Sequence, residues 1–213
     1  MKNKVINVLK NNKQWYILFI CLVVFLFILL NVLNNEITAF DTNIYNSISI
    51  VKNDVATNIF KIITEFGSAK ILIIIALASL VVVKNKKIGI TICINLASIG
   101  LLNQILKRII QRPRPEGFRL VEETGYSFPS GHSMASMAFY GLIIYFIFKN
   151  VKNKVARNSI CVTLSMLIFL IGISRIYLGV HYASDVLAGF LISIAYLILY
   201  VTYILKLIGI KQN

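Results

Sequence analysis

Three short polar stretches interrupt an otherwise apolar chain and carry residue types suited to phosphate chemistry. They read LKRIIQRPRP (106–115), PSGH (129–132) and SRIYLGVHYASD (174–185). Arg and Lys neutralise phosphate oxygens, and free backbone N–H groups at the start of a helix face an anion. The candidate site residues in these stretches are Lys107, Arg114, Ser130, Gly131, His132, Arg175, His181 and Asp185.

The chain has only two histidines, and each lies in one of these stretches. One histidine can act as a nucleophile and the other as a general acid. His181 and Asp185 are spaced i, i+4, which on a helix places them within hydrogen-bond distance. A carboxylate there can fix the tautomer of His181 and stabilise its cation. The three stretches together therefore predict a site for phosphoryl transfer.

The composition predicts an all-α integral membrane protein. Of 213 residues, 58% are hydrophobic and 14% charged, and the mean hydropathy is +0.79, whereas soluble domains are about 45–50% apolar. The net charge of +14 accompanies no soluble basic domain, which argues against nucleic-acid binding. Cys21, Cys93 and Cys161 lie in apolar runs without CxxC spacing, so we expect neither a metal site nor disulfides.

Six apolar segments are long enough, or nearly so, to cross a bilayer, because a span needs about 20 residues. We predict six transmembrane helices at 15–33, 68–83, 88–110, 130–148, 159–178 and 182–205. Apolar residues also recur at steps of three and four within 37–66, which predicts an outer-side amphipathic helix. It is expected to lie in the interface or pack on the bundle, and it is a candidate wall or lid for a lipid substrate. We interpret residues 1–213 as one domain.

The distribution of Lys and Arg predicts the orientation. With both termini in the cytoplasm, the inner side carries thirteen basic residues and no acid: Lys2, Lys4, Lys10, Lys13, Lys84, Lys86, Lys87, Lys149, Lys152, Lys154, Arg157, Lys206 and Lys211. The positive-inside rule favours this arrangement. It places the basic stretch 106–119 on the outer side, where the topology gives no reason for it. We therefore expect an extracytoplasmic anion site.

The three stretches resemble the motifs of the type 2 phosphatidic acid phosphatases, integral-membrane relatives of the vanadium haloperoxidases. In that family the first motif is Lys, six residues and Arg-Pro, as in KRIIQRPRP. The second is Pro-Ser-Gly-His, and the third is Ser-Arg, five residues, His, three residues and Asp, as in SRIYLGVHYASD. All three match without a substitution and in order. The resemblance covers the third span to the start of the sixth.

The resemblance implies a metal-independent, cofactor-free hydrolysis through a phosphohistidine. His181 would attack phosphorus, Asp185 would orient and polarise His181, and His132 would protonate the leaving oxygen and then activate water. The remaining motif residues would bind the phosphate: Lys107, Arg114, Ser130, Gly131 and Arg175. Because His181 must be neutral to attack, we expect Asp185 to accept from one ring nitrogen and leave the other as the nucleophile.

The resemblance implies a lipid phosphatase of the cell membrane, and we favour undecaprenyl diphosphate as its substrate. Phosphatidylglycerophosphate and phosphatidic acid are the alternatives. A non-enzymatic phospholipid binder or carrier would use the same basic pocket, but it would not need a nucleophile, an acid and an orienting carboxylate. Haem ligation by His132 and His181 is disfavoured because the surrounding charges suit an anion better. No obligate protein partner is evident.

Several charged residues fall outside the motif positions. We expect Arg108, Arg112 and Arg119 to contact lipid headgroups or to steer anionic substrates by long-range attraction. Glu122 and Glu123 are expected to be solvated loop charges. These five residues are therefore predicted to lie outside the catalytic machinery.

Overall fold

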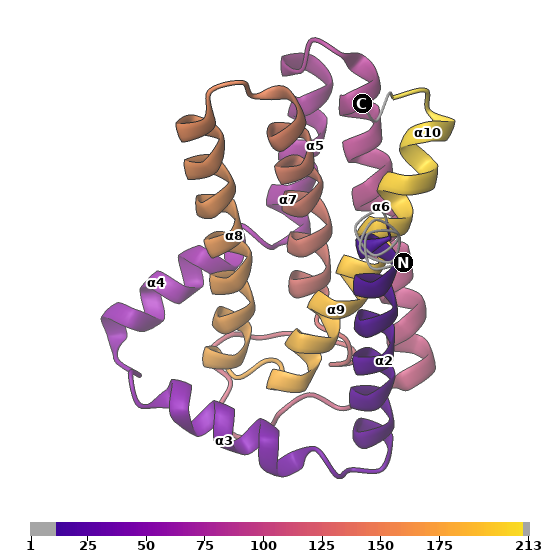
Figure 1. The fold of residues 1–213 in the computed structure, drawn as a ribbon. Helices are drawn as coiled ribbons and strands as arrows, with labels where there is room; N and C mark the ends of the chain where they lie inside the picture. The colour runs from indigo at the N-terminus through magenta and orange to yellow at the C-terminus, as the bar shows by residue number, and fades with distance from the viewer. Residues whose placement is uncertain (1–11, 211–213) are drawn as a thin grey trace.

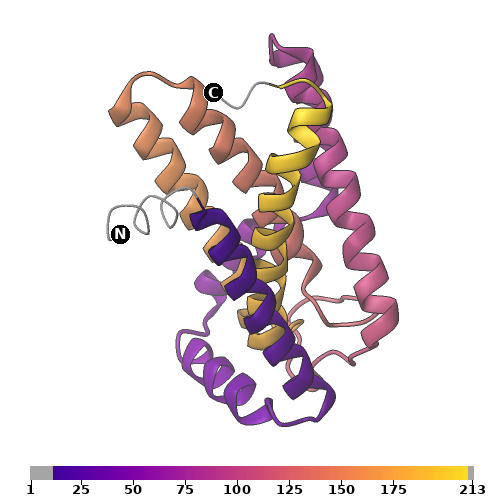
Figure 2. The ribbon, with the colours of Figure 1, turned by 45° about the vertical axis from the view of Figure 1, so that its right-hand side comes forward.

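The computed structural model describes residues 12–210, which form helices joined by loops and no strands within that range (Figure 1). Helices α6 to α9 pack side by side, α5 packs against α6, and α2 packs along α9 (Figure 2). The short helix α3 lies across one end of this bundle. The elements are α2 (Lys13–Leu33), α3 (Thr38–Ser49), α4 (Asp54–Glu65), α5 (Ala69–Val82), α6 (Lys86–Ile110), α7 (Gly131–Asn150), α8 (Lys154–Tyr177), α9 (Ala183–Leu199), the π-helix η1 (Tyr200–Ile204) and α10 (Leu205–Leu207).

Polar side chains begin most of these helices. The residue before each first turn accepts hydrogen bonds from N–H groups that would otherwise lack a partner. Asn153 caps α8 by accepting from Val155 N at 3.0 Å and Ala156 N at 3.1 Å. The other side-chain caps are Asn53 on α4, Ser68 on α5, Asn85 on α6 and Ser130 on α7. Helix α6 ends at Gln111, which adopts the left-handed region with φ of 52°.

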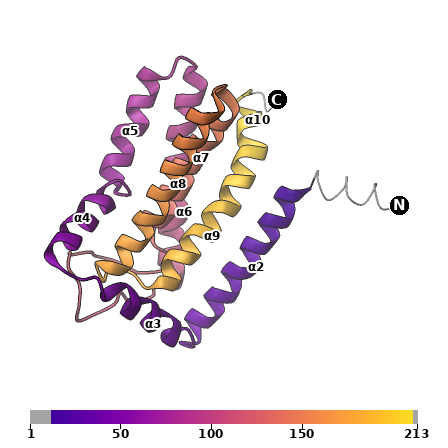
Figure 3. The same cartoon turned by 60° about the vertical axis from the view of Figure 1, so that its left-hand side comes forward.

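The predicted six-span membrane fold is confirmed. Five helices are long and apolar enough to cross a bilayer, and α4 with α5, bent by 43° between them, passes the same test when the pair is taken as one broken span. Helix α5 alone has 14 residues, about 21 Å at 1.5 Å per residue, which is short of the roughly 30 Å hydrocarbon layer. The second span therefore needs α4, which precedes α5 and ends before residue 68, the predicted start of this span (Figure 3). The other spans agree with the predicted boundaries within about five residues.

The predicted single amphipathic helix over 37–66 is wrong in one respect, because the chain breaks it into α3 and α4. Asn53 is extended, with φ of −157°, and its side chain accepts from Ala56 N, so a new helix starts there. The apolar stripe also changes its environment at this break. Ile44 and Ile48 on α3 pack against the bundle, whereas the α4 residues of the stripe are exposed: Val55, Ile59, Ile62 and Phe66.

Lipid replaces a protein core around the outer helices. On α2, Phe19 is 67% exposed and Phe27 is 64% exposed, which no water-soluble surface tolerates as a continuous stripe. The inner face of the same helix packs Phe25 and Ile28 against Phe128, with Ala188 of α9 in the same cluster. The chain is therefore a multi-pass membrane protein whose outer helices have a lipid-facing side, whereas residues 131–147 of α7 are all buried or half-buried.

The basic residues predicted to be cytoplasmic gather at the end of the bundle opposite α3 (Figure 1). That end carries the loops 83–85 and 151–153 and helix α10. The residues in and beside these elements are Lys84, Lys86, Lys87, Lys149, Lys152, Lys154, Arg157 and Lys206. Lys13, the other described member of the predicted set, is the first residue of α2. Lys2, Lys4, Lys10 and Lys211 of the same set lie outside the described residues. Which end faces the cytoplasm stays a prediction.

Two glycines at the α3 end give a test of this fold. Gly179 and Gly117 both have positive φ, 71° and 88°, which costs any other residue roughly 1 kcal/mol or more. A Cβ at Gly179 would also lie 2.7 Å from the carbonyl oxygen of Phe118, whereas nothing lies within 4 Å of one at Gly117. Gly179→Ala should therefore lower the free energy of unfolding in detergent at least twice as much as Gly117→Ala. Equal losses of unfolding free energy in the two variants would contradict the close approach of Gly179 to Phe118.

Candidate active site

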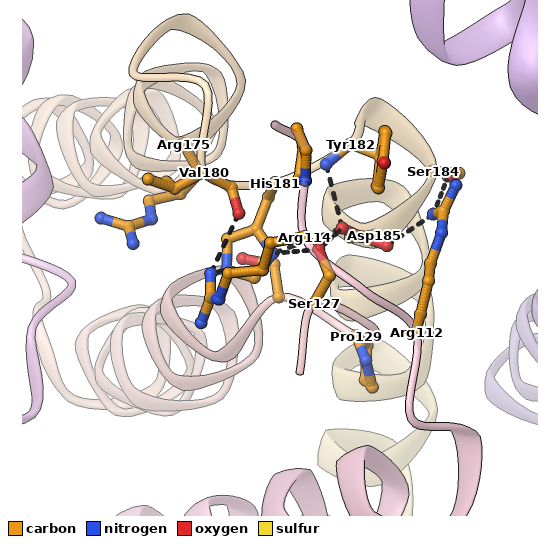
Figure 4. Close-up of polar contacts among 12 residues, drawn as sticks. Arg112, Arg114, Ser127, Pro129, Arg175, Val180, His181, Tyr182, Ser184 and Asp185 are labelled. Carbon is orange, nitrogen blue, oxygen red and sulfur yellow. Dashed lines mark hydrogen bonds and ion pairs between the residues drawn. The ribbon is translucent and has the colours of Figure 1, made fainter. Parts of the chain in front are cut away.

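Four helix ends bring the predicted site residues together at the α3 end of the bundle. Helices α6 and α8 end there, and α7 and α9 begin there, so the loops 111–130 and 178–182 cover the same region (Figure 1). The three motifs, far apart in the sequence, thus meet around His181 (Figure 4). All eight predicted residues lie within this region: Lys107, Arg114, Ser130, Gly131, His132, Arg175, His181 and Asp185.

Asp185 lies at the centre of the buried polar network and is 0% exposed. Its Oδ2 accepts from Tyr182 N at 2.9 Å and lies 3.3 Å from Nδ1 of His181. Ser127 Oγ donates to the same oxygen and lies 3.3 Å from Nδ1 of His181. Ser127 was not a predicted site residue; its only sequence signal is its place two residues before the Pro-Ser-Gly-His motif. The network fixes the carboxylate against the imidazole.

The hydrogen bonds of His181 define its tautomer. Arg114 Nη1 lies 3.1 Å from His181 Nε2, and a guanidinium can only donate. Nε2 must therefore be the unprotonated acceptor, and the ring proton is on Nδ1, which faces Asp185. His181 is 3% exposed, and burial lowers its pKa from 6.5 to about 4 although Asp185 opposes the shift. At neutral pH, His181 is consequently a neutral imidazole with a lone pair on Nε2.

Arg114 is held in place by backbone carbonyls. Its guanidinium donates to Val180 O at 3.0 Å, Gly125 O at 3.0 Å and Thr124 O at 2.9 Å. These three carbonyls come from the two loops that cover the site. The guanidinium is thus preorganised beside Nε2 of His181, where the oxygens of a phosphoryl group would need a donor.

Arg175 is 2% exposed and pairs with Glu123, which lines the cavity beside the two histidines. Its Nη1 donates to Thr64 Oγ1 at 2.8 Å, and its Nη2 pairs with Glu123. The other carboxylate oxygen of Glu123 lies 3.7 Å from Arg114 Nη2. Burial raises the pKa of Glu123, but the charges of Arg175 and Arg114 outweigh burial and lower it overall. The expectation that Glu123 is a solvated loop charge is wrong, since an incoming phosphate must compete with this carboxylate for both arginines.

The Pro-Ser-Gly-His turn is anchored from two sides. Ser130 N donates to the backbone carbonyl of Asp185 at 3.1 Å, which joins the start of α7 to the start of α9. Ser130 Oγ caps α7 by accepting from Ser133 N at 3.4 Å. From α6, the buried Asn103 donates to Pro129 O at 3.0 Å. Asn103 was not predicted, because an amide inside an apolar span gives no indication of what it contacts.

His132 lies on the first turn of α7 and faces a cavity of about 570 Å³. The bend between α4 and α5 lies beside it, because a Cβ on Gly67 would sit 3.2 Å from His132 Cδ2. The cavity is also lined by Lys107, whose Nζ donates to Tyr126 O at 2.5 Å. From His132 and His181 the cavity continues between α5 and α6 along apolar side chains that include Ile73, Leu77, Leu96 and Ala97.

The arginines outside the motif positions do not all face lipid headgroups. Arg119 braces the loop by donating to Pro115 O at 2.5 Å. Arg112 bridges two carboxylates, those of Asp41 and Asp185, each at 2.7 Å. The prediction of headgroup contact is wrong for Arg112, because a guanidinium held by two buried carboxylates is not available to lipid. Nothing in the sequence pairs these three residues, since Asp41 is on α3 and Asp185 on α9.

The donor set of the site suits an anion. Among residues 12–210, no group of three His, Cys, Asp or Glu side chains is arranged to hold a metal ion. Instead, the guanidinium of Arg114, the ammonium of Lys107 and the N-terminus of α7 line the cavity beside His132 and His181, and Arg175 pairs with Glu123, which lines it too. This arrangement can bind a tetrahedral oxyanion between a nucleophilic nitrogen and a second imidazole.

Comparison with known proteins agrees with this geometry. Residues 88–208, more than half of the chain, match the model of the PAP2 superfamily. The chain is 32% identical to phosphatidylglycerophosphatase B of Bacillus subtilis over 163 residues, covering 73% of this chain and 79% of the relative. It is 25% identical to an undecaprenyl-diphosphatase of Sulfolobus acidocaldarius, covering 84% of this chain and 86% of the relative.

Solved structures show the same fold. The crystal structure of a transmembrane PAP2-type phosphatidylglycerolphosphate phosphatase from Bacillus subtilis superposes with a TM-score of 0.81 at 28% identity, covering 92% of this chain and 98% of that one. The structure of Aquifex aeolicus LpxE, at 23% identity, has a TM-score of 0.64 over 76% of this chain and 94% of its own, and supports the fold alone. The chain belongs to the PAP2 superfamily and is a membrane lipid phosphatase, a hydrolase.

Proposed function

We propose that this chain hydrolyses the terminal phosphate of phosphatidylglycerophosphate through a phosphohistidine on His181. The observation that carries the mechanism is the geometry of His181, whose Nδ1 faces Asp185 while its Nε2 faces Arg114 at the cavity. A neutral imidazole oriented in this way carries its lone pair on Nε2, and that lone pair becomes free for attack when Arg114 transfers its hydrogen bond from Nε2 to a phosphate oxygen. Membership of a phosphatase family disfavours the phospholipid-carrier and haem interpretations.

In the first step, His181 Nε2 attacks phosphorus and the bond between phosphorus and the lipid alcohol oxygen breaks. His132, across the cavity, donates a proton to that oxygen, so the lipid leaves as a neutral alcohol. The charge that develops on the phosphoryl oxygens is stabilised by Arg114, Arg175 and Lys107. The imidazolium formed on His181 is stabilised by Asp185, which receives the Nδ1 proton as a hydrogen bond and remains ionised.

In the second step, water attacks the phosphohistidine from the side that the lipid alcohol has left. His132 has lost its proton in the first step and can now accept one from this water. The P–N bond breaks, inorganic phosphate is released, and His181 returns to its neutral form. Each histidine thus ends the cycle as it began.

The substrate has to reach this site from the bilayer. The cavity runs from the two histidines between α5 and α6, and Ile73 and Leu77 on its wall are 49% and 57% exposed. Exposed apolar residues at that depth face acyl chains. This lining supports a lipid that enters sideways, with its phosphate at the histidines and its chains between the helices.

The relatives support two headgroups. The B. subtilis phosphatidylglycerophosphatase B and the solved phosphatidylglycerolphosphate phosphatase support phosphatidylglycerophosphate. The S. acidocaldarius relative supports undecaprenyl diphosphate, which is the substrate favoured from the sequence alone. Phosphatidylglycerophosphate is supported at least as well, and we take it as the first candidate. The extracytoplasmic position of the site remains a proposal based on the positive-inside rule.

Phosphate release from defined lipids tests the substrate. Purified protein in detergent, with EDTA present, should release phosphate from phosphatidylglycerophosphate with a higher kcat/KM than from phosphatidic acid or undecaprenyl diphosphate. Faster turnover of undecaprenyl diphosphate would select the second candidate instead. No release from any of the three lipids by folded protein would contradict the proposed function.

Substitutions of His181 and Asp185 test the mechanism. His181→Ala should abolish turnover and prevent the covalent phosphorylation of the protein. Asp185→Asn should lower kcat by roughly 10⁴-fold, because losing the orienting carboxylate removes the productive tautomer. Its free energy of unfolding should fall as well, because the amide nitrogen of Asn cannot accept from Arg112 or from the donors to Oδ2, so kcat is measured per folded molecule. Phosphorylated histidine in His181→Ala, or near-normal kcat in Asp185→Asn, would refute these roles.

The protonation of His181 gives a direct test of the geometry. Burial disfavours the cation, so the folded protein should keep His181 neutral down to about pH 4, its pKa, and not to 6.5. Because the chain has two histidines, His132→Gln leaves one imidazole signal in histidine-labelled, tag-free protein. Its NMR titration midpoint should lie near pH 4. A midpoint at or above 6.5 would show that the buried arrangement around His181 is wrong.

A further inference from the structure

Arg112 connects the predicted catalytic carboxylate to a helix that carries none of the three motifs. Its Nη1 donates to Asp185 Oδ1 at 2.7 Å, and its Nη2 donates to Asp41 Oδ2 at 2.7 Å (Figure 4 shows the Asp185 side). Asp41 lies in the first turn of α3. The two terminal nitrogens of one guanidinium thus donate to two different carboxylates.

All three groups are shielded from water. Asp185 is 0% exposed, Asp41 is 3% exposed, and the side chain of Arg112 is 14% exposed. The guanidinium carbon of Arg112 stacks 3.9 Å from the centre of the Tyr182 ring. Burial lowers the pKa of Arg112, but Asp185 and Asp41 outweigh burial and raise it overall. Arg112 therefore remains a cation between two anions.

Asp41 also holds the first turn of α9, which carries Asp185. Its Oδ1 accepts from Ser184 N at 2.8 Å, and its Oδ2 accepts from Ser184 Oγ at 2.8 Å. Arg112 Nη1 donates to Ser184 Oγ as well, at 2.8 Å. The carboxylate of α3 thus supplies an acceptor to an N–H group at the helix start that would otherwise lack one.

These contacts divide the two oxygens of Asp185 between different partners. Oδ1 receives Arg112, whereas Oδ2 receives Tyr182 N and Ser127 and faces Nδ1 of His181. Rotation of the carboxylate would break the Arg112 bond together with the bonds to Oδ2. The orientation of Asp185 toward His181 therefore depends on a donor that never touches the imidazole.

We propose that Arg112 and Asp41 are positioning residues, which act through Asp185 to hold His181 in its attacking orientation. The proposal rests on the proposed function of His181 and Asp185. It gives α3 a part in the reaction, since its Asp41 fixes the Arg112 fork on one side while Asp185 holds it on the other. Lysine could not replace Arg112, because a single ammonium group lacks the planar fork that spans two carboxylates.

The test compares Arg112→Met, Arg112→Lys and Asp41→Asn with wild type and with Lys61→Met. Lys61 is an exposed cation on α4, so its removal controls for loss of one positive charge. For each purified, tag-free protein we would measure kcat and KM with phosphatidylglycerophosphate, and the thermal stability in detergent. The pKa of His181 would be read by NMR with His132→Gln added.

Arg112→Met should lower kcat by about 10- to 100-fold with KM changed less than threefold, because misplacement by about 1 Å can cost a hundredfold in rate. The charged groups around His181 are Asp185, Arg114, Arg175 and, by way of the arginines, Glu123. Without Arg112, Asp185 attracts the His181 cation more strongly, so the pKa of His181 should rise by about one unit.

The other variants separate charge from geometry. Arg112→Lys keeps the charge, so the pKa of His181 should stay near that of wild type, while kcat falls about tenfold. Asp41→Asn should also lower kcat about tenfold. The double variant Asp41→Asn, Arg112→Lys should lose no more than about threefold beyond either single variant, since both act through the same carboxylate. Lys61→Met should match wild type in all measurements.

A purely structural role would give a different pattern. The fraction of folded protein would fall while kcat per folded molecule and the pKa of His181 matched wild type, and that result would overturn the proposal. If Arg112→Met does not fold, Arg112→Lys and Asp41→Asn decide by the same criterion. Failure of the proposed function is distinct, because wild type and Lys61→Met would then also release no phosphate.

Discussion

Asp185 carries a carboxylate at 0% exposure at the start of a membrane-spanning helix, where an unpaired charge would cost several kcal/mol. The chain meets this constraint by bringing donors from separate segments to one group. Arg112 and Ser127 come from the loop after α6, and Tyr182 comes from the loop before α9. The loops that cover the site are ordered around this carboxylate, so the charge that serves His181 also organises the end of the bundle.

The buried arginines of the site are also held by several partners. Arg114 donates to backbone carbonyls and lies 3.7 Å from Glu123, whereas Arg175 pairs directly with the carboxylate of Glu123. A carbonyl aligns a cation without cancelling its charge, while Glu123 neutralises part of the site until an anion competes for it. Glu123 therefore offsets part of the positive charge of the two arginines, and a phosphate dianion finds donors that are already positioned.

The parts of this site that the sequence predicts are those encoded locally. The spacing of six apolar segments predicts the spans, and the His181–Asp185 spacing predicts a pair that the structure places 3.3 Å apart. The type and position of Ser130 predict that it caps the helix that follows it, and it caps α7. Asp41 and Arg112 could not be found in this way, because Arg112 bonds to Asp41, which lies 71 positions before it, and to Asp185, which lies 73 positions after it. Glu123 could not be found either, because it belongs to the site only through its ion pairs with Arg175 and Arg114, which the fold brings to it.

The break at Asn53 shows why the amphipathic segment needs the structure for its interpretation. An apolar stripe of one period fits two environments equally well, a protein bundle or a lipid layer. On α3 the stripe faces the bundle, and Asp41 on the same helix reaches Arg112. On α4 the stripe faces lipid, while Thr64 on its other side reaches Arg175. Each of the two helices therefore accepts a hydrogen bond from one arginine at this end of the bundle, so a segment without any family motif helps to hold Arg112 and Arg175 in place.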